Sequence, residues 1–397
     1  AHRALPSGIH PHQSRIIEGN YMASFRDLEK FMDTIPELGV SGIDCIVYRD
    51  HREIFRHAAG YSDIENRVPI SRGTLYNIYS ATKIITCVAA MQLVECGKLL
   101  LTDPLYAYLP EFKDMKVKIG TFVIAPAKRH IRIVDLFTMS AGLSYELDTP
   151  EMRKLITETG GDFNTRDFVG ALAREPLLFE PGEGWNYSYC HDVLGAVIEV
   201  VSGMSFGEYL RENVFHPLAM EDSGFSVPKE KLGRLAPQYE YDNDTRMVAR
   251  ITSKCLGAAG SRHESGGGGL ITTVEDYILF ADALACGGVA MNGERILSKN
   301  TINLMRKNQL DEKRLNDFWS MGYSKGSGYG LGVGVITDSA IACTLTPENA
   351  FYWGGIGGVQ VLVDPDNGLS LFVAQHTFGS PAELIKPKMW NILYSSI

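Results

Sequence analysis

The sequence predicts an α+β, α/β sandwich-like fold: one antiparallel sheet flanked by helices, with an inserted and mainly helical lobe. Near the N-terminus, an amphipathic helix over residues 24–35 precedes two strand-like runs at 42–48 and 53–60, which a polar turn separates. Near the C-terminus, three short apolar runs lie between glycine-rich turns: 332–336, 360–363 and 369–375. Helical patterns and loops fill residues 80–237. The simplest arrangement joins the strands from both ends in one sheet.

A single domain over residues 22–397 is expected, with a sheet lobe at about 22–79 and 240–397 and a helical lobe at about 80–239. Residues 1–21 are expected to be a tail, and Met22 is a candidate for the natural start. This stretch has no apolar core of the kind that a secretory signal contains. We therefore expect a cytoplasmic protein.

Composition and charge exclude some classes of function. The chain has 397 residues, of which 45% are hydrophobic and 21% charged, as in ordinary globular enzymes. Its net charge of −9 and the absence of a basic run argue against binding to nucleic acid or to an anionic membrane. Seven cysteines, an odd number without metal-like spacing, favour a reducing compartment. The partner expected is a small molecule, with no metal or organic cofactor, and the sequence leaves the oligomeric state open.

Ser80 and Lys83 form the most informative pair in the chain. If Ser80 opens a helix, the two side chains lie on one face, about 5–6 Å apart. The residues that follow, up to Gly97, are apolar on nearly all faces, which is typical of a buried helix. Burial lowers the pKa of a lysine so that it can act as a base, and a serine hydroxyl needs such a base. A simple helix N-cap is the alternative role of Ser80.

Two other serines match catalytic patterns less well. Ser226 and Lys229 have the same spacing, but Pro228 suits the first turn of a surface helix. Ser205 lies in a Gly-x-Ser-x-Gly pattern, whose serine in α/β-hydrolases occupies a strand-to-helix turn. Here it lies between two helical runs and forms a capping-box pattern with Glu208. Neither serine is expected to be catalytic.

Histidines and glycines offer weaker candidates. His10 and His12 lack the further ligands that a metal site needs. The glycine run 266–269 lacks the Lys-Ser/Thr of a phosphate-binding loop and is expected to be a tight turn near the site. His376 follows a predicted strand, and a surface or core role is expected for it.

A third group completes the Ser80–Lys83 pair. Tyr187 lies in a turn-rich segment, 181–189, that leads into an apolar run. Read alone, such a tyrosine is most often a core aromatic. Together with the Ser-x-x-Lys pair, however, the segment resembles serine hydrolases related to penicillin-binding proteins and class C β-lactamases. In that superfamily a tyrosine lies between the serine and the lysine and relays protons, which implies this role for Tyr187.

Further matches cover roughly residues 24–380 in the order that the superfamily has. They are the segments 136–143, 267–276 and 328–332, followed by a strand pair around 351–365. No single match is specific, but together they imply a β-lactamase/transpeptidase-like fold.

Two departures from the lactamase pattern bear on the substrate. Where β-lactamases and related peptidases have Lys-Thr-Gly or His-Thr-Gly, this chain has Trp353-Gly354-Gly355, a form that resembles the family VIII carboxylesterases. An indole offers an apolar wall with one N–H donor in place of a cation. Tyr189 stands where the lactamase pattern has an asparagine that binds the acylamide of the substrate. Both changes point away from acidic peptide-like substrates and toward neutral, short-chain esters.

The resemblance implies acyl transfer through a covalent intermediate on Ser80, with Lys83 and Tyr187 sharing the proton transfers. Which of the two is the first base stays open. The oxyanion would be held by the backbone N–H groups of Ser80 and Ile356. Alternatives on the same fold are a class C-like β-lactamase, a D-amino-acid peptidase, an acyltransferase and a non-catalytic binding module. Weak β-lactamase activity beside the esterase activity is also compatible with the pattern.

Overall fold

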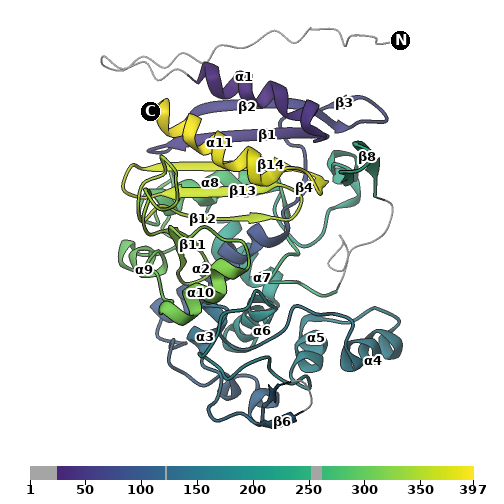
Figure 1. The fold of residues 1–397 in the computed structure, drawn as a ribbon, viewed down its shortest axis with the longest axis vertical. Coiled ribbons are helices and arrows are strands. Elements are labelled where there is room, and N and C mark those ends of the chain that lie inside the picture. Colours follow the sequence, from purple (N-terminus) through teal and green to yellow (C-terminus); the bar gives the residue numbers. More distant parts are fainter. Residues whose placement is uncertain (1–24, 121–122, 252–261) are drawn as a thin grey trace.

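The computed structural model describes residues 25–120, 123–251 and 262–397. Its centre is an eight-stranded sheet in the order β10-β11-β12-β13-β14-β1-β2-β3, and neighbouring strands pair antiparallel (Figure 1). The strands, in that order, are Ser327–Tyr329, Gly334–Ile336, Phe351–Gly355, Val359–Asp364, Leu369–Gln375, Gly42–Arg49, Arg52–Asp63 and Val68–Pro69. The predicted sheet, built from both ends of the chain, is confirmed.

The N-terminal strand β1 enters the sheet between β14 and β2. Ile43 pairs with Gln375 and Arg49 with Leu369, so the two ends of the chain share a full ladder of hydrogen bonds. The tight turn between β1 and β2 places Asp50 and His51 at positive φ. Residues 42–47 are buried, as expected for a strand with both faces covered.

Helices cover both faces of this sheet. On one face, α1 (Arg26–Thr34) and α11 (Ala382–Ser395) lie side by side, and their apolar residues form one core cluster with β1, β13 and β14 (Figure 1). On the other face, α8 (Val274–Ala285) packs on β1, β13 and β14, where the Tyr277 ring stacks on Phe372 at 4.2 Å between centroids. The amphipathic helix expected over 24–35 is thus α1, followed by a 3-10 turn, Ile35–Leu38.

The second lobe is mainly helical and lies below the sheet in Figure 1. Its central pair is α2 (Thr82–Glu95) packed against α6 (Cys190–Ser202), and most residues of both helices are buried. The other α-helices in the described part of the chain are α3 (Ile133–Phe137), α4 (Pro150–Thr159), α5 (Thr165–Leu172), α7 (Phe206–Leu210), α9 (Lys299–Met305) and α10 (Glu312–Ser320). Among the described helices, none on its own has the length and apolar content that a membrane-spanning segment needs.

Small strands also form outside the central sheet. They are a hairpin of β5 (Lys116–Ile119) and β6 (Val123–Pro126), a sheet of β15 (Thr377–Phe378), β7 (Tyr239–Asp242) and β8 (Met247–Arg250), and the pair β4 (Tyr76–Asn77) and β9 (Ile271–Thr272). Of these, only the β5–β6 hairpin falls within 80–237, where helices and loops were expected to dominate, and the sequence did not predict it.

The weaker sequence candidates lie away from any catalytic arrangement. Ser205 is the N-cap of α7, and its Oγ accepts a hydrogen bond from the Glu208 backbone N–H. Lys229 begins an exposed 3-10 helix. The tail at 1–21, His10, His12 and Met22 lie outside the described residues.

Candidate active site

Ser80 lies just before α2 and not inside it. A 3-10 turn, Tyr79–Ala81, precedes the helix, so the expectation that Ser80 opens the α-helix is off by half a turn. Tyr79 has a φ of 46°, a conformation that non-glycine residues rarely adopt. The structure does not use the Ser80 side chain as an N-cap of α2, whose N-cap is Ala81 with no side-chain hydrogen bond.

Lys83 lies one turn further along α2 and is fully buried. Its Nζ is 3.3 Å from Ser80 Oγ and donates a hydrogen bond of 2.5 Å to the Gly267 carbonyl. The Nζ also lies 4.6 Å from the centre of the Tyr187 ring. Burial lowers the pKa of Lys83, and nearby groups, among them the Asp192 carboxylate, offset part of this effect. The lysine is placed to accept a proton from the serine.

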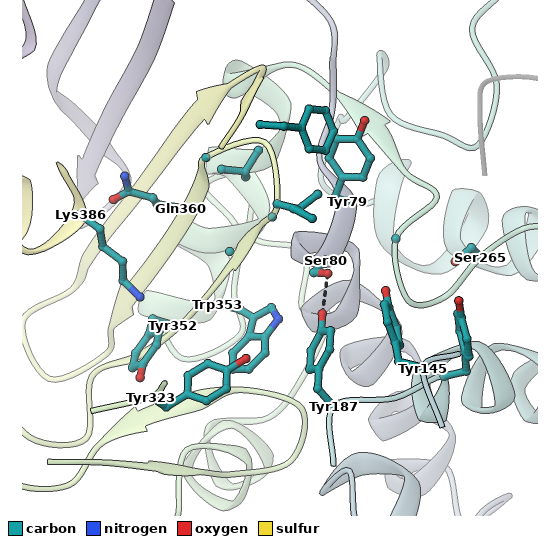
Figure 2. A pocket seen from close by; sticks show the side chains of 18 of the residues that line it. Tyr79, Ser80, Tyr145, Tyr187, Ser265, Tyr323, Tyr352, Trp353, Gln360 and Lys386 are labelled. Atoms are coloured by element: carbon teal, nitrogen blue, oxygen red, sulfur yellow. Dashed lines mark hydrogen bonds between the residues drawn. The ribbon is translucent and has the colours of Figure 1, made fainter. Parts of the chain in front are cut away.

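Tyr187 reaches Ser80 from the loop before α6. Its hydroxyl donates a hydrogen bond of 2.5 Å to Ser80 Oγ (Figure 2). Burial raises the pKa of Tyr187 well above its ordinary value of 10.0, which keeps the phenol protonated at neutral pH. The structure therefore brings the three side chains singled out from the sequence, Ser80, Lys83 and Tyr187, into one hydrogen-bonding group.

The glycine run at 266–269 forms a turn that supports Lys83. Asp192 on α6 is buried next to this turn, and the Ser265 hydroxyl donates a hydrogen bond of 2.5 Å to its carboxylate. Burial would raise the pKa of Asp192, but contacts with His263, Lys83 and Ser265 hold it below its ordinary value. A Cβ atom on Gly267 would lie only 2.3 Å from Asp192 Oδ2. Glycine at this position lets the Gly267 carbonyl reach Lys83.

A cavity of about 810 Å³ opens in front of Ser80. Aromatic side chains form most of its wall (Figure 2): Tyr79, Tyr145, Phe168, Tyr187, Tyr189, Tyr323, Tyr352, Trp353 and Phe378. The residues expected to form the substrate pocket, Tyr189, Trp353, Gly354 and Gly355, all line it. The volume and the apolar wall suit a small organic molecule.

The end of β12 runs close to the serine turn because Gly355 has no side chain. A Cβ atom there would lie 2.3 Å from the Ile78 carbonyl oxygen. This approach brings the backbone that follows, at Ile356, to the same cavity as Ser80, while 68% of the Ile356 residue remains exposed to solvent. The position suits the second N–H donor of an oxyanion hole.

Several cavity residues were missed from the sequence. Tyr145, in the loop after α3, stacks on Tyr189 with ring centroids 4.5 Å apart, and Lys83 Nζ lies 5.6 Å from its ring centre. Tyr323 stacks on Trp353 at 5.5 Å. Lys386, on α11, also lines the cavity. No local motif marks these residues, because they reach the site only through tertiary packing.

His376 has the core role expected for it. The imidazole is buried, its Nδ1 lies 3.0 Å from the Ala236 carbonyl, and its Nε2 accepts a hydrogen bond from the Asn77 N–H. Burial lowers its pKa to about 4, so it stays neutral at physiological pH. It connects β4 to β15 and does not line the cavity.

Three of the described side chains are of types that bind metal ions and lie close together. The ligand atoms of His51, Asp282 and Cys286 lie within 4.8 Å of one another. His51 Nδ1 is 2.7 Å from the Asp282 carboxylate, which accounts for the pairing without an ion. None of the three lines the cavity at Ser80.

Comparison with known proteins places this geometry in a family. A family model described as "Beta-lactamase" matches residues 19–392. Protein Rv1367c of Mycobacterium tuberculosis is 33% identical over 351 residues, covering 85% of this chain and 86% of the relative. Esterase EstB of Burkholderia gladioli is 28% identical over 362 residues, covering 87% and 88%. Among solved structures, EstCE1, a hydrolase with promiscuous acyltransferase activity, has a TM-score of 0.78 and 25% identity, covering 93% of this chain and 98% of its own.

Proposed function

This chain belongs to the β-lactamase family and is a serine hydrolase of that fold, and we propose that it cleaves carboxylic esters through an acyl-enzyme on Ser80. One observation carries the proposal. Ser80 Oγ lies 2.5 Å from the Tyr187 hydroxyl and 3.3 Å from Lys83 Nζ, in the wall of an aromatic cavity. A nucleophile in contact with both a base and a proton donor is what acyl transfer requires.

Lys83 is the first base in this proposal. Its lowered pKa makes the neutral amine accessible, whereas the raised pKa of Tyr187 disfavours a phenolate in the resting enzyme. The Ser80 hydroxyl transfers its proton to Lys83 Nζ while Oγ attacks the ester carbonyl carbon. The neutral amine keeps its orientation because one of its N–H groups donates to the Gly267 carbonyl.

Collapse of the tetrahedral intermediate needs a proton for the leaving alkoxide. Tyr187 delivers that proton, and the proton that Lys83 took from Ser80 restores the phenol. The negative charge on the carbonyl oxygen is held by the backbone N–H groups of Ser80 and Ile356. Water then attacks the acyl-enzyme by the reverse sequence of proton transfers and releases the acid.

Trp353 favours an ester over a β-lactam as the substrate. It occupies the place where the lactamase pattern has a cation, and it is almost fully buried between Tyr187 and Tyr323. The carboxylate of a β-lactam would find an apolar indole face there. The esterase EstB among the relatives supports the same choice.

Acyl transfer to an alcohol is a second candidate. The wall of the cavity is mostly aromatic, which favours organic alcohols over water at the acyl-enzyme. The relationship to EstCE1, whose description includes acyltransferase activity, supports this candidate. Added alcohols that increase the rate of p-nitrophenol release and yield new esters would support transfer.

Labelling with a fluorophosphonate probe tests the function. The probe should attach to the wild-type protein and to Ser205→Ala, but not to Ser80→Ala, and hydrolysis of p-nitrophenyl butyrate should follow the same pattern. Loss of Ser80 should lower kcat by several orders of magnitude while the circular dichroism spectrum is retained. Hydrolysis that survives in Ser80→Ala and disappears in Ser205→Ala would assign the nucleophile to α7 and refute the proposal.

A further inference from the structure

The cavity at Ser80 extends around the free edge of a strand. β11 pairs with Phe351 and Tyr352 of β12, so among the described strands none pairs with Trp353–Gly355 on that side. Side chains from both faces of the sheet line the cavity: Trp353 belongs to the core cluster that contains α2, whereas Tyr352 belongs to the cluster that contains α11. A substrate can thus extend from Ser80 past this edge to the α11 side.

Lys386 occupies the α11 side of the cavity. Its Nζ lies 4.1 Å from the centre of the Tyr352 ring and 4.4 Å from that of Trp390. Figure 2 shows Lys386 pointing toward Tyr352. Among the residues whose side chains the structure describes, none forms an ion pair with Lys386, and the residues that line the cavity include no aspartate or glutamate. Burial lowers the pKa of Lys386 to about 8. In a protein with a net charge of −9, the cavity thus holds a partly buried cation whose partners among the described side chains are two aromatic rings.

Gln360 adds a second polar group on this side. Strand alternation puts it on the same face as Leu362, which packs in the α11 cluster. The residue is 3% exposed and lines the cavity, and neither its Nε2 nor its Oε1 has a hydrogen-bond partner among the described residues. Buried amides are normally hydrogen-bonded, so the unpaired amide of Gln360 is available to a ligand that enters this part of the cavity.

We infer that the esters cleaved at Ser80 carry a carboxylate at the end remote from the scissile bond, and that Lys386 binds this carboxylate with Gln360 beside it. This inference rests on the proposed esterase function and makes it more specific. The missing cation at position 353 pointed to neutral esters, but Lys386 supplies a positive charge in another part of the cavity. The aromatic residues between the two ends then bind an apolar connecting chain.

Matched ester pairs test the inference. The substrates are p-nitrophenyl monoesters of adipic, suberic and sebacic acid, each compared with the same molecule in which the free carboxylate is a methyl ester. Wild-type protein should prefer the carboxylate member in kcat/KM, mainly through a lower KM. Lys386→Met keeps an unbranched apolar side chain over Tyr352 but removes the charge. It should lower kcat/KM for the carboxylate members by roughly ten- to a hundredfold and leave the methyl esters unchanged.

Lys388→Met is the control. Lys388 lies on the same helix, is exposed and contacts the Phe31 ring at 5.9 Å, and it does not line the cavity. It should leave both members of each pair unchanged. A carboxylate preference that survives in Lys386→Met, or an equal loss for both members, would overturn the inference. Hydrolysis of the methyl esters that still depends on Ser80 would then leave the esterase function standing.

A binding measurement makes the outcome independent of turnover. Monomethyl suberate, a carboxylate that bears an ester, is titrated by calorimetry into Ser80→Ala and into Ser80→Ala/Lys386→Met. Binding that is weakened at least about tenfold in the double variant supports the inference. Equal binding by the two proteins contradicts it, whether or not the wild-type protein hydrolyses esters.

Discussion

The phenol of Tyr187 stacks on the indole of Trp353, with ring centroids 6.0 Å apart and an angle of 25° between the planes, while its hydroxyl hydrogen-bonds Ser80. Trp353 is held in turn by Tyr323 at 5.5 Å and by the edge of Tyr329 at 5.2 Å. The residue that replaces the lactamase cation therefore also fixes the orientation of the proposed proton donor. In the proposed function, substrate preference and proton transfer therefore depend on one aromatic cluster.

Tyr187→Phe should lower kcat for p-nitrophenyl butyrate by roughly a hundredfold or more, because a positioned proton donor contributes about this much. The ring and its stacking on Trp353 are retained, so KM and the melting temperature should change little. Tyr329→Phe is the matched control. It removes another buried hydroxyl of the same cluster, one that has no described hydrogen-bond partner and does not line the cavity. A similar loss in both variants would show that packing, and not the Tyr187 proton, sets the rate.

Lys83→Arg should fail nearly as completely as Lys83→Met in the acylation step. Arginine keeps the positive charge but does not release its proton in a protein, so it cannot be a base. Acylation is measured as the single-turnover burst of p-nitrophenol, with a loss of roughly a thousandfold expected for both variants. A near-normal burst in Lys83→Arg would reduce the role of Lys83 to electrostatics.

The pH dependence of acylation should rise and then level off. Burial lowers the pKa of Lys83 from 10.5, and the base must be neutral to accept the Ser80 proton. The active fraction therefore increases as pH rises through the lowered pKa and saturates above it. Burial raises the pKa of Tyr145 and Tyr187, so these phenols titrate at higher pH. A kcat/KM profile for a neutral ester that falls over the range between neutrality and pH 10 would contradict a neutral lysine as the first base.

How much of the site and fold can be predicted from the sequence depends on whether each feature is marked by neighbouring residues in the chain. The Ser80–Lys83 spacing and the apolar run after it are local, and the sequence alone is enough to identify the pair. The sequence did not predict that Ser80 lies in a 3-10 turn before the helix, because this turn depends on the positive φ of Tyr79. The β5–β6 hairpin escaped prediction for a different reason. Ile119 and Val123 are more than half exposed, so the hairpin lacks the alternation of a half-buried strand.

Residues brought to the cavity by tertiary packing were beyond sequence reasoning. Lys386 lies in a C-terminal segment in which the sequence marks no site, and the packing of α11 beside β12 brings it to the cavity. Tyr145 lies in a loop without periodicity. By contrast, Tyr189 and Trp353 could be placed at the cavity because they fall at fixed positions of segments that resemble the superfamily.

Gly267→Ala should impair catalysis without unfolding the protein. The new Cβ would lie 2.3 Å from Asp192 Oδ2, a buried carboxylate that Ser265 holds in place, so the turn must shift and carry the Lys83 acceptor with it. A displacement of about 1 Å can cost up to a hundredfold in rate, and we expect a loss of at least roughly tenfold in kcat. Gly170→Ala, on α5, is the control.

A Cβ atom on Gly170 meets nothing within 4 Å. This control should leave kcat unchanged and stabilise the protein by up to about 1 kcal/mol, as expected for glycine replaced by alanine in a helix. Thermal melting and steady-state kinetics on both variants check the two predictions. Unchanged kcat in Gly267→Ala would mean that the contact between Gly267 and Lys83 does not orient the base.

Esters should be cleaved faster than β-lactams. Trp353 and Tyr189 stand where a lactamase has groups for the carboxylate and the acylamide, and each such hydrogen bond contributes about 1.5–3 kcal/mol. Their joint absence should lower kcat/KM for a β-lactam by roughly two to four orders of magnitude. Lys386 does not replace the missing cation, because it approaches from the α11 side of the sheet, beyond the free edge of β12.

The measurement compares kcat/KM for p-nitrophenyl butyrate with that for nitrocefin, and the ester should be favoured by at least about a hundredfold. Slow nitrocefin hydrolysis that disappears in Ser80→Ala is compatible with this prediction, because both reactions use the same nucleophile and oxyanion hole. Nitrocefin hydrolysis as efficient as that of the ester would mean that another residue supplies the missing contacts. The β-lactamase assignment would then replace the esterase proposal, and Lys386→Met would be the first variant in which to look for the loss of that activity.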